Sequence, residues 1–213
     1  PGPPDAAVRS AHGLPADTDL FVYAGTHGYV HGLEVVLDAA DLLRDEAVTF
    51  VLVGGGSEKP ALVERARGMG LANVRVLDPV GPEEVARLLR AATAGLATVR
   101  AGDAYRAIRS AKMFPTMATE LPVLYSGDDE GARLVGEVGA GIVTTPGDAA
   151  ALADAVQRVR SEPGTARKLG GTGRRWVEEH ASWERLGGGW LDELGDLPTR
   201  RGAPSWRSPT RTG

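Results

Sequence analysis

The chain has 213 residues, 42% of them hydrophobic and 24% charged, with a net charge of −4, which predicts one globular domain with a substantial core. The absence of cysteine excludes disulfides, thiolate metal sites and cysteine nucleophiles, and the slightly acidic balance gives no reason to expect a nucleic-acid partner. No apolar run reaches the roughly 18 residues that a membrane-spanning helix needs, so no span is expected in this chain.

Short apolar runs alternate along the chain with segments of helical periodicity. The runs predict strands at residues 21–24, 49–53, 74–77, 96–99, 123–126 and 142–144. Helices are predicted at 33–43, from an N-cap at Ser57 to 68, from Pro82 to 92, close to Pro115, and from an N-cap at Asp148 to 159. The pattern predicts an α/β, Rossmann-like fold: a doubly wound, mainly parallel six-stranded sheet with helices on both faces.

The two ends of the chain differ in composition from its centre. Residues 1–19 begin Pro-Gly-Pro-Pro and are interpreted as an interdomain linker and lead-in to a domain at 20–194. Within this domain, Trp176, Trp183 and Trp190 lie seven residues apart, which predicts a helix or a broken pair of helices packed onto it. Residues 195–213 contain almost nothing apolar and are predicted to be a disordered tail.

The segment after the first predicted strand is rich in glycine and lies at the sheet edge where ligands of such folds bind. Glycines allow close approach of the backbone, and the N–H groups at the start of a helix suit a diphosphate. The candidate contacts are Gly25, Thr26, His27, Gly28 and His31. The alternative is a tight turn without a ligand. His27 and His31 lie four residues apart, but the glycines indicate a loop and no third ligand is near, so no metal site is predicted.

Three further segments at this edge carry candidate chemistry. Gly54 and Gly55 follow the second strand, where they leave room for a ligand or form a plain strand-to-helix turn. Arg106, Arg109 and Lys112 follow the fourth strand, where cations either bind an anion or are solvated surface charges. The acidic residues 128–130 follow the fifth strand and either accept ribose or sugar hydroxyls or cap a helix.

Several short sequence segments, taken in their order along the chain, resemble one protein family. They are Tyr23-Ala24-Gly25 with His31-Gly32-Leu33, Val51 to Gly56, Lys112-Met113-Phe114 with Met117-Ala118 and Pro122-Val123-Leu124, Gly139 to Val143 with Pro146-Gly147-Asp148, and His180 to Trp183. From about Val8 to Leu194 the chain is similar to the C-terminal domain of group-1 retaining glycosyltransferases of the GT-B fold, a family that includes WbuB-like sugar transferases.

The resemblance implies a function. In such enzymes two Rossmann-like domains face each other: the N-terminal one binds the acceptor, and the C-terminal one binds a nucleotide-diphosphate sugar. The glycosyl group is transferred with retention of configuration, without a cofactor or a bound metal. Residues 20–194 would then be the donor-binding domain of a bacterial hexosyltransferase of cell-surface polysaccharide biosynthesis. We expect it to be inactive without its N-terminal partner domain, and to lie in the cytoplasm or, through that domain, at the inner face of the membrane.

The resemblance also indicates individual residues. Lys112 and Arg109 would stabilise the leaving diphosphate by electrostatic catalysis. Met113 and Glu130 would join the glycine segments in the substrate site.

The chain departs from the family at charged positions. His31 and Thr26 replace a frequent lysine and arginine, and Ala107 and Pro115 replace two glutamates, the second of which usually holds the ribose. Glu120 replaces a glycine; Glu120, Asp128 and Glu130 are candidates for a substitute ribose contact. These departures leave two alternatives: a degenerate nucleotide-sugar-binding or partner-stabilising module without catalysis, and a nucleotide-sugar epimerase.

Overall fold

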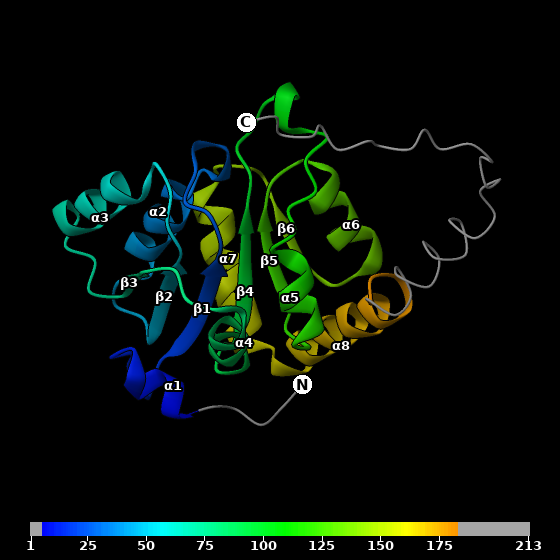
Figure 1. Cartoon of the computed structure of the whole chain (residues 1–213), viewed down its shortest axis with the longest axis horizontal. Coiled ribbons are helices and arrows are strands. Elements are labelled where there is room, and N and C mark those ends of the chain that lie inside the picture. Colours follow the sequence, from blue (N-terminus) through cyan, green and yellow to red (C-terminus); the bar gives the residue numbers. More distant parts are fainter. Residues whose placement is uncertain (1–5, 183–213) are drawn as a thin grey trace, which may run out of the picture.

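The computed structural model describes residues 6–182 and contains one six-stranded sheet (Figure 1). The strands are β1 (Asp19–Ala24), β2 (Val48–Val53), β3 (Val74–Leu77), β4 (Ala94–Thr98), β5 (Val123–Ser126) and β6 (Gly141–Thr144). The helices are α1 (Ala6–Ala11), α2 (Glu34–Leu42), α3 (Lys59–Gly68), α4 (Pro82–Arg90), α5 (Met113–Ala118), α6 (Glu130–Val138), α7 (Ala149–Ser161) and α8 (Pro163–His180), with the 3-10 turns η1 (Tyr29–His31) and η2 (Asp103–Tyr105).

The strand order is β3-β2-β1-β4-β5-β6, and every neighbouring pair is parallel. This confirms the predicted doubly wound, six-stranded Rossmann-like sheet. The predicted bounds of β3 and β5 agree with the structure, whereas β4 begins two residues earlier than predicted. Its first residues are Ala94 and Gly95, which have little strand propensity by themselves. Gly95 lies there because a Cβ would overlap the side chain of Thr116, so α5 packs unusually close to β4.

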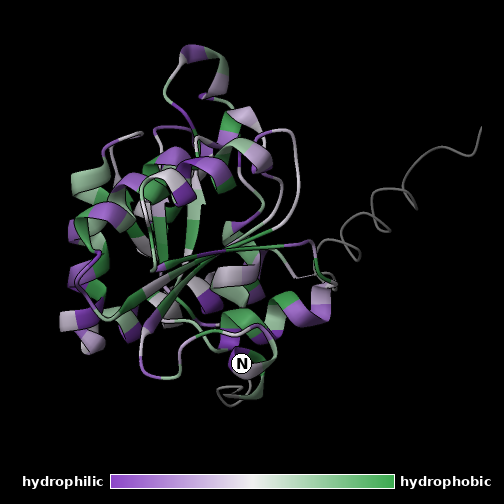
Figure 2. Cartoon of the chain, turned by 90° about the vertical axis from the view of Figure 1, so that its left-hand side faces the viewer, coloured by the Kyte–Doolittle hydropathy of each residue, from purple (hydrophilic) through white to green (hydrophobic). Residues whose placement is uncertain are grey.

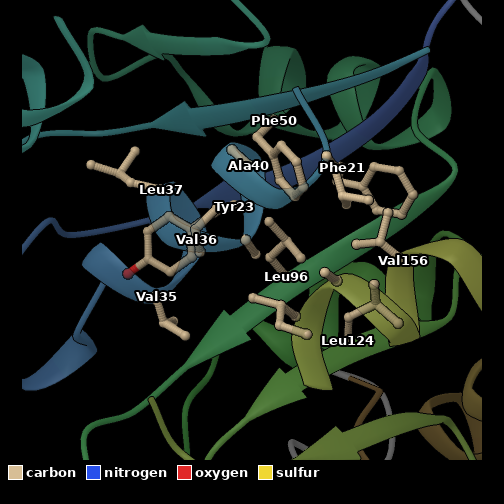
Figure 3. Close-up of a cluster of buried hydrophobic side chains, with 14 of the residues drawn as sticks. Phe21, Tyr23, Val35, Val36, Leu37, Ala40, Phe50, Leu96, Leu124 and Val156 are labelled. Atoms are coloured by element: carbon tan, nitrogen blue, oxygen red, sulfur yellow. The ribbon is translucent and has the colours of Figure 1, made fainter. Parts of the chain in front are cut away.

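Helices cover both faces of the sheet, and the strands between them are largely hydrophobic (Figure 2). One core cluster joins α2, α3 and α7 to one face. In it Phe21, Phe50 and Leu96 from the strands meet Val36 of α2 and Val156 of α7 (Figure 3). Two further clusters on the opposite face join α1 and α4 to β1 and β2, and α5, α6 and α8 to β4 and β5.

The lead-in contains a helix that the sequence did not predict. Val8 of α1 is fully buried against the α4 side of the core. The Arg9 guanidinium donates to the carbonyls of Thr18 (2.7 Å) and Ala91 (3.0 Å), and His12 contacts Glu84 at 2.8 Å. Residues 6–14 therefore pack as part of the domain, while the linker role of residues 1–19 stays a prediction.

Two predicted helix starts have different outcomes. Asp148 caps α7 by accepting from the N–H of Ala151, and Pro82 opens α4, as predicted. Ser57 does not cap α3, so that prediction is wrong: the N-cap is Glu58, without a side-chain hydrogen bond, and Lys59 begins the helix.

Part of the region predicted to be helical around the three tryptophans lies in the described residues. α8 ends at His180 and packs against α5. Trp176 stacks on Phe114 of α5, which agrees with the predicted packing role of the first tryptophan. Trp183, Trp190 and the predicted disordered tail lie outside the described residues. Among residues 6–182, no helix is long and apolar enough to cross a membrane.

Candidate functional site

The predicted ligand edge is the carboxyl edge of the sheet, at the top of Figure 1. β1 and β4 are neighbours in the middle of the sheet, and the chain leaves them toward opposite sides. This is the topological switch point, where folds of this type bind ligands. The loop after β1, the loop after β2 and the segment before α5 meet at this point.

The loops after β1 and β2 interlock through their backbones. The N–H of His27 donates to the carbonyl of Gly55 (2.8 Å), and the N–H of Glu58 donates to the carbonyl of His27 (2.9 Å). Gly54 has a φ of +148°, and a Cβ there would overlap the carbonyl of Gly25. Glycine is required at position 54 for both reasons, since a side chain would be strained and would separate the loops.

Lys112 reaches across the sheet edge to the first glycine loop. Its Nζ lies 3.2 Å from Nε2 of His31 and 5.5 Å from the ring centre of Tyr23. Gly25 has a φ of +154°, and a Cβ there would overlap the Lys112 stem. The Tyr23 hydroxyl donates to the carbonyl of Thr26 (2.7 Å), which fixes the loop above the ring. The Lys112 stem thus packs against Gly25, and its ammonium group lies over the Tyr23 ring.

The environment disfavours protonation of both His31 and Lys112. Burial, followed by the charge of Lys112, lowers the pKa of His31 to about 4, although the Thr98 carbonyl opposes this. Burial also lowers the pKa of Lys112. Because an ammonium only donates, the short contact requires Nε2 of a neutral His31 to accept. Among residues 6–182, Lys112 makes no ion pair with a carboxylate. The cluster therefore has a positive charge without a neutralising partner, which suits an anion.

Lys59 has a structural role below this cluster. Its Nζ donates to the carbonyls of Gly54 (3.0 Å) and Leu77 (2.8 Å) and to the carboxylate of Asp78 (2.7 Å). These contacts use all three donors of the ammonium group. Lys59 thus ties the end of β2 to the end of β3 and keeps the glycine loop in place. Sequence analysis did not select it, although it is one of only three lysines in the chain.

Arg109 and Glu130, both predicted site residues, form an ion pair with each other. This pair joins the segment before α5 to the first turn of α6. Both side chains are partly exposed, so a ligand could separate them, but in this structure Arg109 already has a counter-ion. Lys112 is the better anion contact for this reason.

A second arginine, missed by the sequence analysis, supports the other side of the glycine loop. Arg100 lies 4.1 Å from the ring centre of Tyr29, donates from Nε to the Tyr29 carbonyl (2.6 Å) and pairs with Glu34 (2.5 Å). Tyr29, Glu34 and Arg100 together line two cavities, of about 190 Å³ and 350 Å³. Arg100 therefore fixes η1, which carries His31.

The predicted contacts separate into two groups. Gly25, Thr26, Gly28 and His31 lie with Lys112 at the sheet edge. His27 and Met113 are fully buried, His27 between the two glycine loops and Met113 in the core under α5. Neither side chain is exposed at the sheet edge in this structure, and the ligand contacts predicted for His27 and Met113 stay predictions. Gly54 and Gly55 contribute backbone shape.

The family's glutamate positions have no acceptor here. Ala107 is exposed, and Pro115 lines an apolar groove of about 740 Å³ between α5 and α8, together with Phe114 and Trp176. No group of three or more potential ligands among residues 6–182 could hold a metal ion. Lys112 and His31 are therefore the candidate anion contacts at this edge of the sheet.

Comparison with known proteins identifies similar chains and structures. Over 69 residues, 32% of this chain and 17% of the relative, the chain is 41% identical to WcaI of Escherichia coli (strain K12), whose name describes a colanic acid biosynthesis glycosyl transferase. The structure is similar to that of Anabaena Alr3699/HepE in complex with UDP and glucose (TM-score 0.79, 18% identity), with 92% of this chain and 53% of that chain covered.

Two other solved structures share the fold. Sucrose-phosphate synthase from Thermosynechococcus elongatus matches with a TM-score of 0.72 and 25% identity, over 90% of this chain and 49% of that one. WaaG, a glycosyltransferase involved in lipopolysaccharide biosynthesis, matches with a TM-score of 0.73 and 15% identity, over 90% and 51%. The chain spans about half the length of these structures. Residues 18–162 match the family described as Glycosyl transferases group 1, and the chain belongs to that family.

Proposed function

We propose that this chain is the donor-binding half of a retaining glycosyltransferase and that it binds the diphosphate of a nucleotide sugar at Lys112 and His31. The contact that supports this proposal most strongly is the one between Lys112 Nζ and His31 Nε2, at 3.2 Å beside Gly25. It lies at the switch point of the sheet, and the lysine makes no ion pair among the described residues. A diphosphate would supply the negative charge that the cluster lacks.

The proposed chemistry is electrostatic. When the glycosyl bond breaks, negative charge develops on the leaving diphosphate, and a fixed ammonium beside it stabilises that charge. Lys112 suits this role because its stem packs against Gly25 and its ammonium group lies over the Tyr23 ring, so little reorganisation is needed. We propose that no metal or cofactor takes part. The acceptor would come from an N-terminal domain, without which transfer would not occur.

The proposed setting follows from the family and its relatives. WcaI and WaaG are named for colanic acid and lipopolysaccharide biosynthesis, respectively. We therefore place this chain in a bacterial hexosyltransferase that builds a cell-surface polysaccharide, working in the cytoplasm or at the inner face of the membrane.

A second candidate function is a nucleotide-sugar-binding module without catalysis. The observation that favours it is the surroundings of Pro115, which lines an apolar groove where the family usually has a ribose-binding carboxylate. Such a module would bind a nucleotide diphosphate through Lys112 but would hold the ribose weakly.

Calorimetric titration with UDP, GDP and TDP, and with UDP-glucose, tests the binding proposal. Lys112→Ala should weaken binding of the preferred nucleotide by about 1.5–3 kcal/mol, the loss of a charge-assisted hydrogen bond. Lys168→Ala, at an exposed lysine on α8, is the matched control and should leave affinity unchanged. Absence of binding by the unmodified chain to all three diphosphates would refute the proposal.

Two further measurements separate the candidates. Binding that withstands a chelator supports metal independence, whereas chelator-sensitive binding contradicts it. Sugar transfer by the protein that includes the acceptor domain, abolished by Lys112→Ala, supports the transferase. Nucleotide-sugar binding without turnover of any donor would favour the module.

A further inference from the structure

A buried polar cluster lies directly behind the segment that carries Lys112. Tyr125 and Asp129 are fully buried, and Ser110 is 3% exposed. The Tyr125 hydroxyl donates to Oδ1 of Asp129 (2.8 Å), and the same oxygen accepts from the N–H groups of Gly131 (2.7 Å) and Ala132 (3.3 Å). One carboxylate oxygen therefore joins the end of β5 to the start of α6.

The cluster also contacts the segment between β4 and α5. Burial raises the pKa of the Tyr125 hydroxyl, and the Asp129 carboxylate raises it further, so the phenol stays protonated and donates. Two backbone hydrogen bonds make the contact with the segment: the N–H of Glu130 donates to the Arg106 carbonyl (3.0 Å) and that of Gly131 to the Ile108 carbonyl (3.2 Å). The first turn of α6 thus holds residues 106–108.

The segment is held from its other end by α5. Met113 begins this helix, and its N–H donates to the Ser110 carbonyl (3.4 Å). Thr116 packs against Gly95 of β4 and donates to the Lys112 carbonyl (3.3 Å). Lys112 therefore lies between two anchors, the helix after it and the polar cluster before it.

Packing alone does not account for this cluster. The second oxygen of Asp129 and the Ser110 hydroxyl are both buried, and neither has a hydrogen-bond partner within the described residues. A buried polar atom without a partner is destabilising, and apolar side chains could fill the same space. A Cβ at Gly127 would lie only 2.7 Å from the unpaired oxygen of Asp129, so the space around it is fully used.

We propose that Tyr125 and Asp129 are positioning residues that fix the 106–112 segment through the first turn of α6 and so place the Lys112 ammonium at the diphosphate site. The expected effect of these residues on nucleotide binding rests on the proposed function, whereas their effect on the 106–112 segment does not. A simple N-cap would need only Asp129 and the first turn of α6. The Tyr125 hydroxyl donates to the same Asp129 oxygen that caps this turn, so it supports the turn that holds residues 106–108.

Hydrogen exchange of the unliganded chain tests the structural part. Tyr125→Phe removes one oxygen and leaves the ring and the Asp129 cap in place. The amides of Glu130 and Gly131, which donate to the segment, should exchange about tenfold faster, as expected from the loss of one buried hydrogen bond. Thr144→Val is the matched control: its buried hydroxyl faces the Tyr125 carbonyl from β6, away from the segment. Unchanged exchange at these two amides in Tyr125→Phe would overturn the proposal.

Titration with UDP tests the functional part. Tyr125→Phe should weaken binding at least threefold when Lys112 is present and have no further effect in a Lys112→Ala background, whereas Thr144→Val should leave affinity unchanged. Equal weakening in both backgrounds would overturn the proposal, since Tyr125 would then not act through Lys112. If the unmodified chain binds no nucleotide, the proposed function fails, and the exchange rates still decide whether the cluster holds the segment.

Discussion

Glu120 has a backbone conformation that favours glycine, and replacing it should stabilise the protein. Its φ is +64°, and among residues 6–182 it is the one non-glycine residue with a positive φ. It follows the end of α5, where a left-handed residue commonly terminates a helix and is usually glycine. Its carbonyl lies so close to α8 that a Cβ at Gly170 would overlap it, so the backbone cannot relax to a negative φ.

The expected gain in the free energy of unfolding is the difference between relieved backbone strain and increased freedom of the unfolded chain. The left-handed conformation is unfavourable by about 1–2 kcal/mol for a residue with a Cβ. Glycine loses about 0.4–1 kcal/mol through its greater freedom in the unfolded chain. Glu120→Gly should therefore raise the free energy of unfolding by about 0.5–1 kcal/mol and the melting temperature by about 1–4 °C.

Urea denaturation followed by circular dichroism measures this change. The midpoint should rise without a change in slope, since the surface exposed on unfolding is the same. Glu120→Ala is the control, because it removes the carboxylate but keeps the Cβ, and it should show no gain. An equal gain in both variants would refute the backbone explanation and assign the effect to the charge.

Three further predictions concern other parts of the molecule. Arg160→Met should lower the free energy of unfolding at neutral pH, because the variant loses the ion pair between Arg160 and Glu46. This pair holds the pKa of Glu46 below 4.5, so its stabilising effect is lost when Glu46 is protonated, and the two proteins should become more alike below about pH 4.5. A stability difference that does not change with pH would contradict this. Asn73→Ala should lower the free energy of unfolding, measured by thermal denaturation, by about 1–3 kcal/mol, since its buried amide donates to the Ala40 carbonyl (2.9 Å) at the end of α2. An unchanged free energy would show that water replaces the amide. UDP-glucose should bind more tightly as pH falls from about 7.5 to 5.5, because a bound diphosphate raises the pKa of His31 from about 4 and draws in a proton, and His31→Gln should remove this dependence.

The fold was predictable from the sequence because its strands are continuous apolar runs with helical periodicity between them. The start of β4 was not, because Gly95 is selected by contact with Thr116, far along the chain. Helix α1 was missed for a similar reason: Val8 gains its burial from α4, and the short segment has no periodicity of its own.

The site was predictable only in part. The glycine loop and Lys112 follow strands that end at the same sheet edge, so their proximity could be expected from topology. The burial of His27 could not, because it results from the interlocking of two loops. The pairing of Arg109 with Glu130 likewise depends on how α6 approaches the segment before α5.

The protonation of His31 decides whether the charge of a bound diphosphate can be balanced at the proposed site. The diphosphate of a nucleotide sugar carries two negative charges, and Lys112 supplies one positive charge. His31 is neutral near pH 7 because burial and the neighbouring ammonium lower its pKa to about 4. A diphosphate bound between Lys112 and His31 would oppose the effect of the ammonium on the His31 pKa, since its negative charge favours the protonated ring. The site would thus gain its second cation only when the donor is bound, and the proton would be released again when the diphosphate leaves.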